Sequence, residues 1–259
     1  MLQAVKAPAH GIRLGRVGWS LASLAALIAL WEIIALIAAS RYLPGPLAVV
    51  EVMAREAKAG ELWGNIGATL SRVAFSFVVA MCIGSAIGIA LGRNPRADRF
   101  FDTWLIFFLN LPALVIIVLC YIWFGLTEVA AITAVAVNKI PNVAVTMREG
   151  TRNLSKDLEE MAAIYRFGWW KTLRHVTLPQ LAPYFAAASR SGLALVWKIV
   201  LVVEAFGRSD GVGHQLNIAF QLFDVPMILA YALAFIIVVQ IIEIAILQPL
   251  IARANKWRR

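Results

Sequence analysis

The sequence predicts an all-α polytopic membrane protein with six transmembrane helices and both termini on the cytoplasmic side. Hydrophobic residues make up 61% of the 259 residues and the mean hydropathy is +0.77, whereas an average soluble domain is about 45–50% apolar. Several apolar stretches exceed the roughly 20 residues that a helix needs to cross a bilayer. Lysine and arginine gather in alternate loops, as membrane topology requires. Because no soluble segment remains between the spans, residues 1–259 are expected to form one transmembrane domain.

The apolar stretches place the spans in order at about 17–39, 66–92, 101–124, 128–147, 179–206 and 226–250. The first is too long for the apolar region of a signal peptide, so we expect it to be retained. Pro44-Gly45-Pro46 predicts a turn after it. Residues 47–62 then predict an amphipathic helix on the outer surface. This helix is either an interfacial connector or part of a docking surface for a periplasmic partner.

Particular residues within the spans have structural consequences. Gly84, Gly88 and Gly92 repeat every fourth position, which favours close packing of a second helix. Pro112, which follows Asn110 closely in the third span, removes a backbone hydrogen bond and predicts a kink. The kink either serves packing alone or exposes carbonyl groups to a water-filled path. Asn138, Lys139 and Pro141 interrupt the fourth span.

The distribution of positive charge predicts the orientation. Inner segments hold 16 of the 24 lysine and arginine residues, outer loops hold four, and the remaining four lie within spans. This bias places residues 148–177 in the cytoplasm. The net charge of +9 therefore reflects topology and does not indicate binding to nucleic acid.

The cytoplasmic loop 148–177 predicts a helix–turn–helix platform. Leu154, Leu158, Met161 and Tyr165 follow helical spacing on one face, and Ser155 is positioned as the N-cap. A second short helix is expected over residues 169–175, and the following proline, at position 179, suits the first turn of the fifth span. A water-facing platform of this kind on a membrane protein usually docks a partner.

Charged residues inside the spans need partners or water, because a charge at the centre of a transmembrane helix costs about 2.5–3.5 kcal/mol. Lys198 either lines a translocation path and favours an anionic solute, or pairs with Glu32 or Glu243 from a neighbouring helix. Glu204 lies six residues later, which is about 240° around the helix, so a direct pair with Lys198 is not expected. The residues predicted to line the path are Asn110, Asn138, Lys198 and Glu204.

Catalytic patterns are missing from the sequence. It contains no phosphate-binding P-loop, no HExxH, no CxxC and no metal-ligand spacing. Cys82 and Cys120 fall inside spans, where they are expected to pack, and the three histidines have no evident catalytic partner. We therefore predict a protein that is not an enzyme, with no catalytic residue, metal or cofactor of its own.

The loop also resembles a family motif. Leu178-Pro179, with Glu160-Met161-Ala162 upstream, resembles the cytoplasmic "EAA" loop of ATP-binding cassette (ABC) importer permeases. The glycine of that motif falls on Arg166, and Gly168 follows two residues later. We therefore expect the turn between the two short helices to bend at Gly168, because glycine adopts such turns without strain.

Further segments resemble the nitrate/sulfonate/taurine group of these permeases. The matching residues are Asn65, Thr69, Leu70 and Arg72, Leu111-Pro112, Trp123-Phe124-Gly125, Pro141, Thr146, Pro183, Arg190, Glu204, and Gly211-Val212-Gly213; Ala188 stands where a glycine is usual.

The resemblance implies a permease subunit of the bacterial inner membrane that moves a small anionic solute. It implies a homodimer, two separate ATPase subunits that hold ATP and Mg, and a periplasmic solute-binding protein, all in contact with membrane lipid. The residues expected to couple to the ATPase are Glu160, Met161, Ala162, Tyr165, Arg166, Phe167, Gly168 and Trp169. The alternative is an ATP-independent secondary transporter or channel that acts as a dimer.

Overall fold

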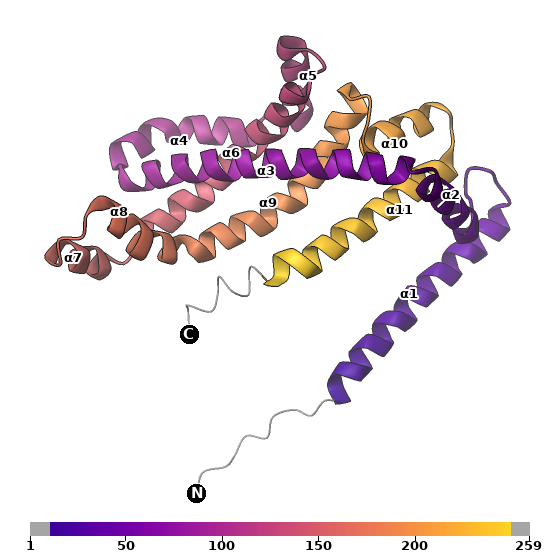
Figure 1. Cartoon of the computed structure of the whole chain (residues 1–259), viewed down its shortest axis with the longest axis horizontal. Coiled ribbons are helices and arrows are strands. Elements are labelled where there is room, and N and C mark those ends of the chain that lie inside the picture. The colour runs from indigo at the N-terminus through magenta and orange to yellow at the C-terminus, as the bar shows by residue number, and fades with distance from the viewer. Residues whose placement is uncertain (1–10, 250–259) are drawn as a thin grey trace, which may run out of the picture.

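The computed structural model describes residues 11–249 and is helical, as predicted (Figure 1). Five helices of this described part are long and apolar enough to cross a membrane, or six if one bent pair counts as a span. The end of the sixth expected span at residue 250, Lys6 and the basic tail 253–259 lie outside the described residues. The helices are α1 (Gly11–Ala38), α2 (Pro46–Ala59), α3 (Glu61–Arg93), α4 (Pro95–Asn110), α5 (Ala113–Phe124), α6 (Glu128–Arg152), α7 (Lys156–Ile164), α8 (Trp169–Thr172), α9 (Leu178–Gly207), α10 (Val212–Gln221) and α11 (Val225–Ile242).

The core of the fold is the packing of α3, α6 and α9. The predicted glycine spacing on α3 is what brings α6 close. A methyl group added at Gly84 would lie 2.7 Å from the Val143 Cβ, and one at Gly92 would lie 2.5 Å from the Thr151 Cβ. A side chain at Gly88 would strike the backbone of α6. The expectation of close helix packing at these three glycines is confirmed.

The third expected span is broken rather than kinked, which corrects the sequence prediction. α4 ends at Asn110, α5 begins at Ala113, and the two helices are bent by 93°. Leu111 has φ −66° and ψ 127°, an extended conformation that the following proline favours by steric exclusion of the helical one. Pro112 therefore ends one helix and starts another.

Two other elements differ from the sequence prediction. Residues 207–223, between the fifth and sixth expected spans, contain a further helix, α10, which buries Val212 and Ala219 against the bundle. Pro179 lies in the first turn of α9, as expected, but α8, a π-turn at 173–177 and α9 follow one another without a break, so residues 169–207 form one helical run. The wider turn precedes the proline, whose missing N–H cannot join the regular helical pattern.

The two ends of the bundle carry different elements. α7 and α8 lie at one end, where α3 also finishes and α4 starts, and α2 and α10 lie at the other (Figure 1). The predicted amphipathic helix is present as α2, which buries Val49 and packs on α11 and α3. α1 diverges from the bundle and leaves most of its apolar surface uncovered (Figure 1).

Candidate functional site

The platform at residues 154–175 has the helix–turn–helix form that the sequence predicts. α7 begins after Ser155, whose Oγ accepts a hydrogen bond of 3.5 Å from the Leu158 N–H, so the predicted N-cap is confirmed. Asp157 and Glu159 occupy the first turn, where the helix dipole favours negative charge. α8 and the π-turn then continue into α9, so the platform is joined directly to a transmembrane helix.

The turn of the platform bends at Arg166, so the prediction that it bends at Gly168 is wrong. Arg166 has φ +51°, in the left-handed region, whereas Gly168 has φ −65° and ψ 160°. The Phe167 N–H donates to the Ala162 carbonyl at 2.8 Å, and the Arg166 N–H donates to the Ala163 carbonyl at 3.0 Å. This is the Schellman pattern, which requires a left-handed residue at the position after the C-cap. Arginine occupies it at a cost in strain, because its Cβ crowds the backbone.

The platform presents apolar side chains that no residue in the described range 11–249 covers. Ile164, Tyr165 and Trp169 are 78%, 71% and 76% exposed. Met161 and Phe167 are partly exposed beside them, with the rings of Tyr165 and Phe167 6.5 Å apart. Large aromatic side chains rarely stay uncovered on a water-facing surface unless they bind a partner.

The remaining coupling residues surround these apolar side chains. Glu160, Arg166 and Gly168 are exposed, whereas Ala162 is buried and anchors α7. Sequence reasoning missed Ile164, although its spacing of three from Met161 places it next to the predicted face.

Lys198 lies in a cavity of about 330 Å³ between α9 and α11 that Arg190 also lines. Gln240 and Glu243 of the last helical segment complete the polar part of its wall. Among residues 11–249, no carboxylate forms an ion pair with Lys198, so the expected alternative of a pair with Glu32 or Glu243 is not formed here. Two cations and one carboxylate leave the cavity with a net positive charge.

The two asparagines predicted to line the same path lie elsewhere. Asn110 is exposed at the end of α4, where its Nδ2 donates to the Ile106 carbonyl at 2.7 Å. Asn138 is half-buried on α6, beside Lys139. Lys139 is 1% exposed, and its Nζ donates to the Asn142 Oδ1 at 2.8 Å. The structure therefore does not gather the four predicted path residues around one cavity.

Glu204, the fourth predicted path residue, is wholly buried in a charged cluster at the other end of the bundle. Its Oε1 accepts a hydrogen bond of 2.8 Å from Arg72 on α3. Arg72 also binds Glu128, the first residue of α6, at 2.6 Å, and Asp210, in the connection to α10, at 2.5 Å. We call these four residues the Arg72 clamp. The clamp joins α3, α6 and α9, and it corrects the expectation that Glu204 lines an open path.

Further hydrogen bonds, from backbone and side-chain groups, connect the Arg72 clamp to the segment that leads into α10. The second carboxylate oxygen of Glu204 accepts hydrogen bonds of 2.9 Å from the Thr69 hydroxyl and from the Gly213 N–H. The Thr69 hydroxyl accepts from the Val212 N–H at 2.9 Å, and the Asn65 Oδ1 accepts from the Gly211 N–H at 2.8 Å. The motif residues 65, 69, 72, 204 and 211–213, which are far apart in sequence, thus form one site. The separate motif matches were the available signal, but their spatial convergence was not predicted.

Comparison with known proteins agrees with this architecture. Residues 80–256 match the family described as "Binding-protein-dependent transport system inner membrane component". The chain is 28% identical to a putative aliphatic sulfonates transport permease protein of Bacillus subtilis, over 94% of this chain and 89% of that protein. It is 24% identical to the taurine transport system permease protein of Escherichia coli, over 92% of this chain and 89% of that protein.

A third relative and a solved structure extend the comparison. The bicarbonate transport system permease protein of Synechococcus elongatus is 28% identical, over 71% of this chain and 70% of that protein. An inward-facing structure of the MetNI methionine ABC transporter shares the fold, with a TM-score of 0.62 and 18% identity, over 72% of this chain and 92% of that chain. The family match covers more than half of the sequence, so the chain belongs to the binding-protein-dependent transport system inner membrane components.

Proposed function

We propose that this chain is the membrane-spanning subunit through which an ATP-driven importer moves a small anionic solute. The observation that carries the proposal is the uncovered apolar platform on α7 and α8, which is continuous with α9. The family is a component of transport systems. ATP and Mg belong to a separate ATPase subunit, which the platform docks.

Docking follows from the chemistry of the platform. Tyr165, Phe167 and Trp169 would insert into a groove on the ATPase and lose their contact with water. Glu160 and Arg166 at the rim would orient that contact by charge. Movement of the ATPase would then reach the membrane through the helical run 169–207. An importer of this design uses two ATPase subunits, one for each of two copies of this chain.

The solute is inferred from the cavity on α9. A lysine near the middle of the bilayer is costly against lipid, so the exposed Lys198 is expected to face water. A second copy of this chain would enclose that face and form the path. With Arg190 in the same cavity, the charge favours an anion. The named relatives transport aliphatic sulfonates, taurine and bicarbonate, which all carry an anionic oxygen group. A periplasmic binding protein would deliver the solute at the end with α2 and α10.

The docking proposal is tested by co-purification of the permease with its ATPase. Phe167→Asp places a charge on the platform and is expected to release the ATPase. Phe220→Asp makes the same change at an exposed position on α10, at the other end of the bundle, and should leave the ATPase bound. Retention of the ATPase by the Phe167 variant would contradict the proposal.

The solute proposal is tested by ATP-dependent uptake in vesicles that contain the assembled transporter. Lys198→Ala should abolish uptake of the anion while the ATPase stays bound, and Lys198→Arg should retain uptake because the charge is kept. Uptake at the original rate by Lys198→Ala would contradict a role for Lys198 in the path of the anion. ATP-independent flux through this chain alone in liposomes would instead support the secondary transporter or channel that the sequence left open.

A further inference from the structure

The platform is joined to α9 in two ways. Along the chain, α8 continues through the π-turn at 173–177 into α9. Across space, the side chain of Gln180, in the first turn of α9, reaches Ser155 at the start of α7, and its Oε1 accepts a hydrogen bond of 2.9 Å from the Ser155 N–H. The Gln180 Nε2 donates to the Val176 carbonyl at 3.0 Å. One side-chain amide therefore connects α7, the π-turn and α9.

The π-turn is a place where the connection along the chain can bend. Its backbone departs from regular helical bonding, and sharp bends in helices occur at π-turns. Pro179, directly after the turn, has no N–H to donate. A force on α8 alone would therefore bend residues 173–177 and leave α9 in place. Gln180 lies beyond this turn, so its bond to Ser155 connects α7 to α9 without passing through the turn.

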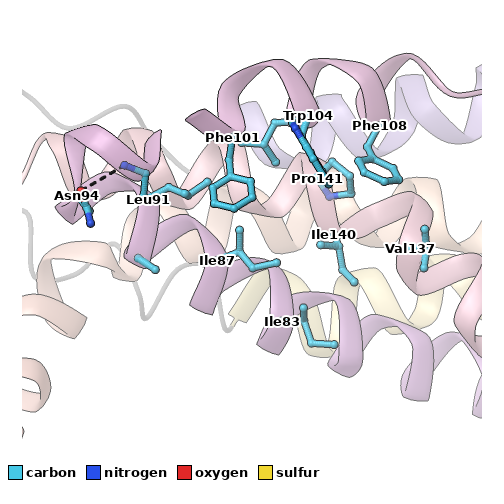
Figure 2. Close-up of a pocket in the computed structure, with 13 residues that line it drawn as sticks. Ile83, Ile87, Leu91, Asn94, Phe101, Trp104, Phe108, Val137, Ile140 and Pro141 are labelled. Carbon is cyan, nitrogen blue, oxygen red and sulfur yellow. Dashed lines mark hydrogen bonds between the residues drawn. The ribbon is translucent and has the colours of Figure 1, made fainter. Parts of the chain in front are cut away.

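The last residue of the π-turn is attached to α3. Thr177 is fully buried, and its hydroxyl accepts a hydrogen bond of 2.8 Å from the guanidinium of Arg93, the last residue of α3. The corner that follows is held by Asn94, whose Oδ1 accepts a hydrogen bond of 3.2 Å from the Ala97 N–H (Figure 2). α4 then runs beside α3 and α6, with an apolar groove of about 600 Å³ between the three helices (Figure 2). Thr177 thus gives α9 a fixed point close to Gln180.

The start of α7 lies where α6 and α9 come together. Leu154 packs against a buried cluster that residues of α3, α6 and α9 form. Close by, a Cβ at Gly150 of α6 would lie 2.6 Å from the ring of Tyr184 on α9, so the two helices are in tight contact. Ser155 follows Leu154 directly, and both Ser155 and Gln180 are partly buried. The bond between them therefore forms at a packed junction and not on the exposed apolar surface of the platform.

We propose that Gln180 is a positioning residue for coupling, whose amide makes α9 follow α7 when a bound ATPase moves the platform. This inference rests on the proposed docking of an ATPase. With the amide present, a movement of α7 pulls on the first turn of α9 beside its fixed point at Thr177. Without it, the platform is joined to α9 through the π-turn, which bends. ATP would then be hydrolysed while α9 stays in place.

A bond that only stabilised the fold would behave differently. Its loss would lower the amount of folded transporter, so ATP hydrolysis and the movement of α9 would fall in proportion. Loss of a coupling bond leaves hydrolysis unchanged and lowers the movement of α9 alone. The two quantities measured on the same sample therefore separate the two roles.

The test measures the position of α9 in the full-length chain with its ATPase in lipid nanodiscs, trapped with ATP and vanadate. Spin labels are placed on Cys82 of α3, which is exposed, and on Leu195→Cys of α9, which lies beyond the π-turn, whereas Cys120 is buried and stays unlabelled. Dilution with unlabelled copies restricts the measured distances to pairs within one chain. Gln180→Leu should lower the ratio of shifted to unshifted molecules about fivefold, the factor that one net hydrogen bond contributes to a population. The rate of ATP hydrolysis should stay the same.

Two further variants separate this bond from other effects near the platform. Gln180→Glu keeps an acceptor oxygen for the Ser155 N–H and loses the donor to Val176, so it should keep most of the shift of α9. Asn153→Leu is the matched control, because the Asn153 Nδ2 donates within its own helix, to the Glu149 carbonyl at 2.8 Å. Asn153→Leu should therefore leave the shift unchanged.

Four outcomes would overturn the proposal. The first is an unchanged ratio of shifted to unshifted molecules in Gln180→Leu, and the second is a loss of the shift in proportion to a loss of hydrolysis. The third is an equal loss of the shift in Gln180→Leu and Asn153→Leu. The fourth is ATP hydrolysis by the unaltered complex with no shift of α9. Failure of the unaltered chain to bind an ATPase, seen in co-purification before any label is attached, would instead overturn the proposed function on which the inference rests.

Discussion

Substitution of Gly88 by alanine tests the packing on which the bundle depends. The added methyl group would meet the Ala144 carbonyl, and it would lie 2.7 Å from the Met147 Cβ and 3.0 Å from the Arg148 backbone nitrogen. Alanine gains about 1 kcal/mol over glycine in helix propensity. Overpacking costs about 1–3 kcal/mol, and the upper end applies because backbone atoms of α6 cannot rotate away. The expected net loss of stability is therefore about 2 kcal/mol.

Gly67→Ala on the same helix is the matched control. A methyl group at Gly67 would have no neighbour within 4 Å, so only the propensity gain of about 1 kcal/mol remains. Gly67→Ala and Gly88→Ala should therefore differ by about 3 kcal/mol. Unfolding by increasing sodium dodecyl sulfate, followed by circular dichroism, measures this difference. Equal stability of the two variants would refute the inference that contact between α3 and α6 at Gly88 is tight.

Three other predictions follow from particular residues. Arg166→Gly should stabilise the platform by about 1 kcal/mol, because it relieves the strain of the left-handed conformation, whereas Gly168→Ala should be near neutral because φ there is −65° and a Cβ would meet nothing. Protection of the loop from proteolysis would measure both effects. The reverse order of stability would show that the turn does not bend at Arg166. Glu204→Gln should lower the free energy of unfolding by about 3–5 kcal/mol. The double variant with Arg72→Gln should lose less stability than the two single variants together, as measured by a double-mutant cycle in detergent unfolding. Strict additivity would mean that the two side chains do not interact. Lys139→Met should be neutral or stabilising in the same assay, because it removes a buried charge whose one partner among residues 11–249 is the Asn142 amide. A large loss of stability would indicate a role for the charge.

The sequence could predict the elements whose cause is local. Apolar runs longer than a bilayer crossing placed the spans, Ser155 marked the start of α7, and the glycine spacing on α3 indicated the contact with α6. α10 was missed because Gly211 precedes it and Gly213 lies in its first turn, and glycines are typical of loops. Val212 and Ala219 nevertheless have the spacing of one buried helical face.

The remaining features depend on tertiary contacts that no local pattern reveals. Arg166 adopts positive φ because α7 ends in a Schellman pattern at that position, and propensity alone would assign the turn to a nearby glycine. Glu204 was expected to line an open path, because its partner Arg72 is 132 residues away in sequence. Such a pair becomes visible only when the helices are placed side by side.

The glycines of the connection 207–213 explain how a carboxylate can be buried in the clamp. Gly211 has φ +104°, and a Cβ there would lie 2.5 Å from a carboxylate oxygen of Glu204. A Cβ at Gly213 would lie 2.8 Å from the Glu204 Cβ, so the backbone passes directly over this side chain. That approach lets the Gly213 N–H donate to the carboxylate, which offsets part of the cost of its burial.

The same glutamate lies near the end of the helical run that starts at the platform. Residues 169–207 are 39 residues long, so a helix of that length extends about 58 Å, from Trp169 at one end of the bundle to the clamp at the other. A displacement of α8 by an ATPase would therefore be transmitted to the Arg72 clamp through the helical run 169–207. The run departs from regular helical bonding at the π-turn at 173–177 and at Pro183, which has no N–H to donate, so bending is expected at these two places. Under the proposed docking, transmission of this displacement to the clamp thus requires the run beyond Pro183 to stay rigid.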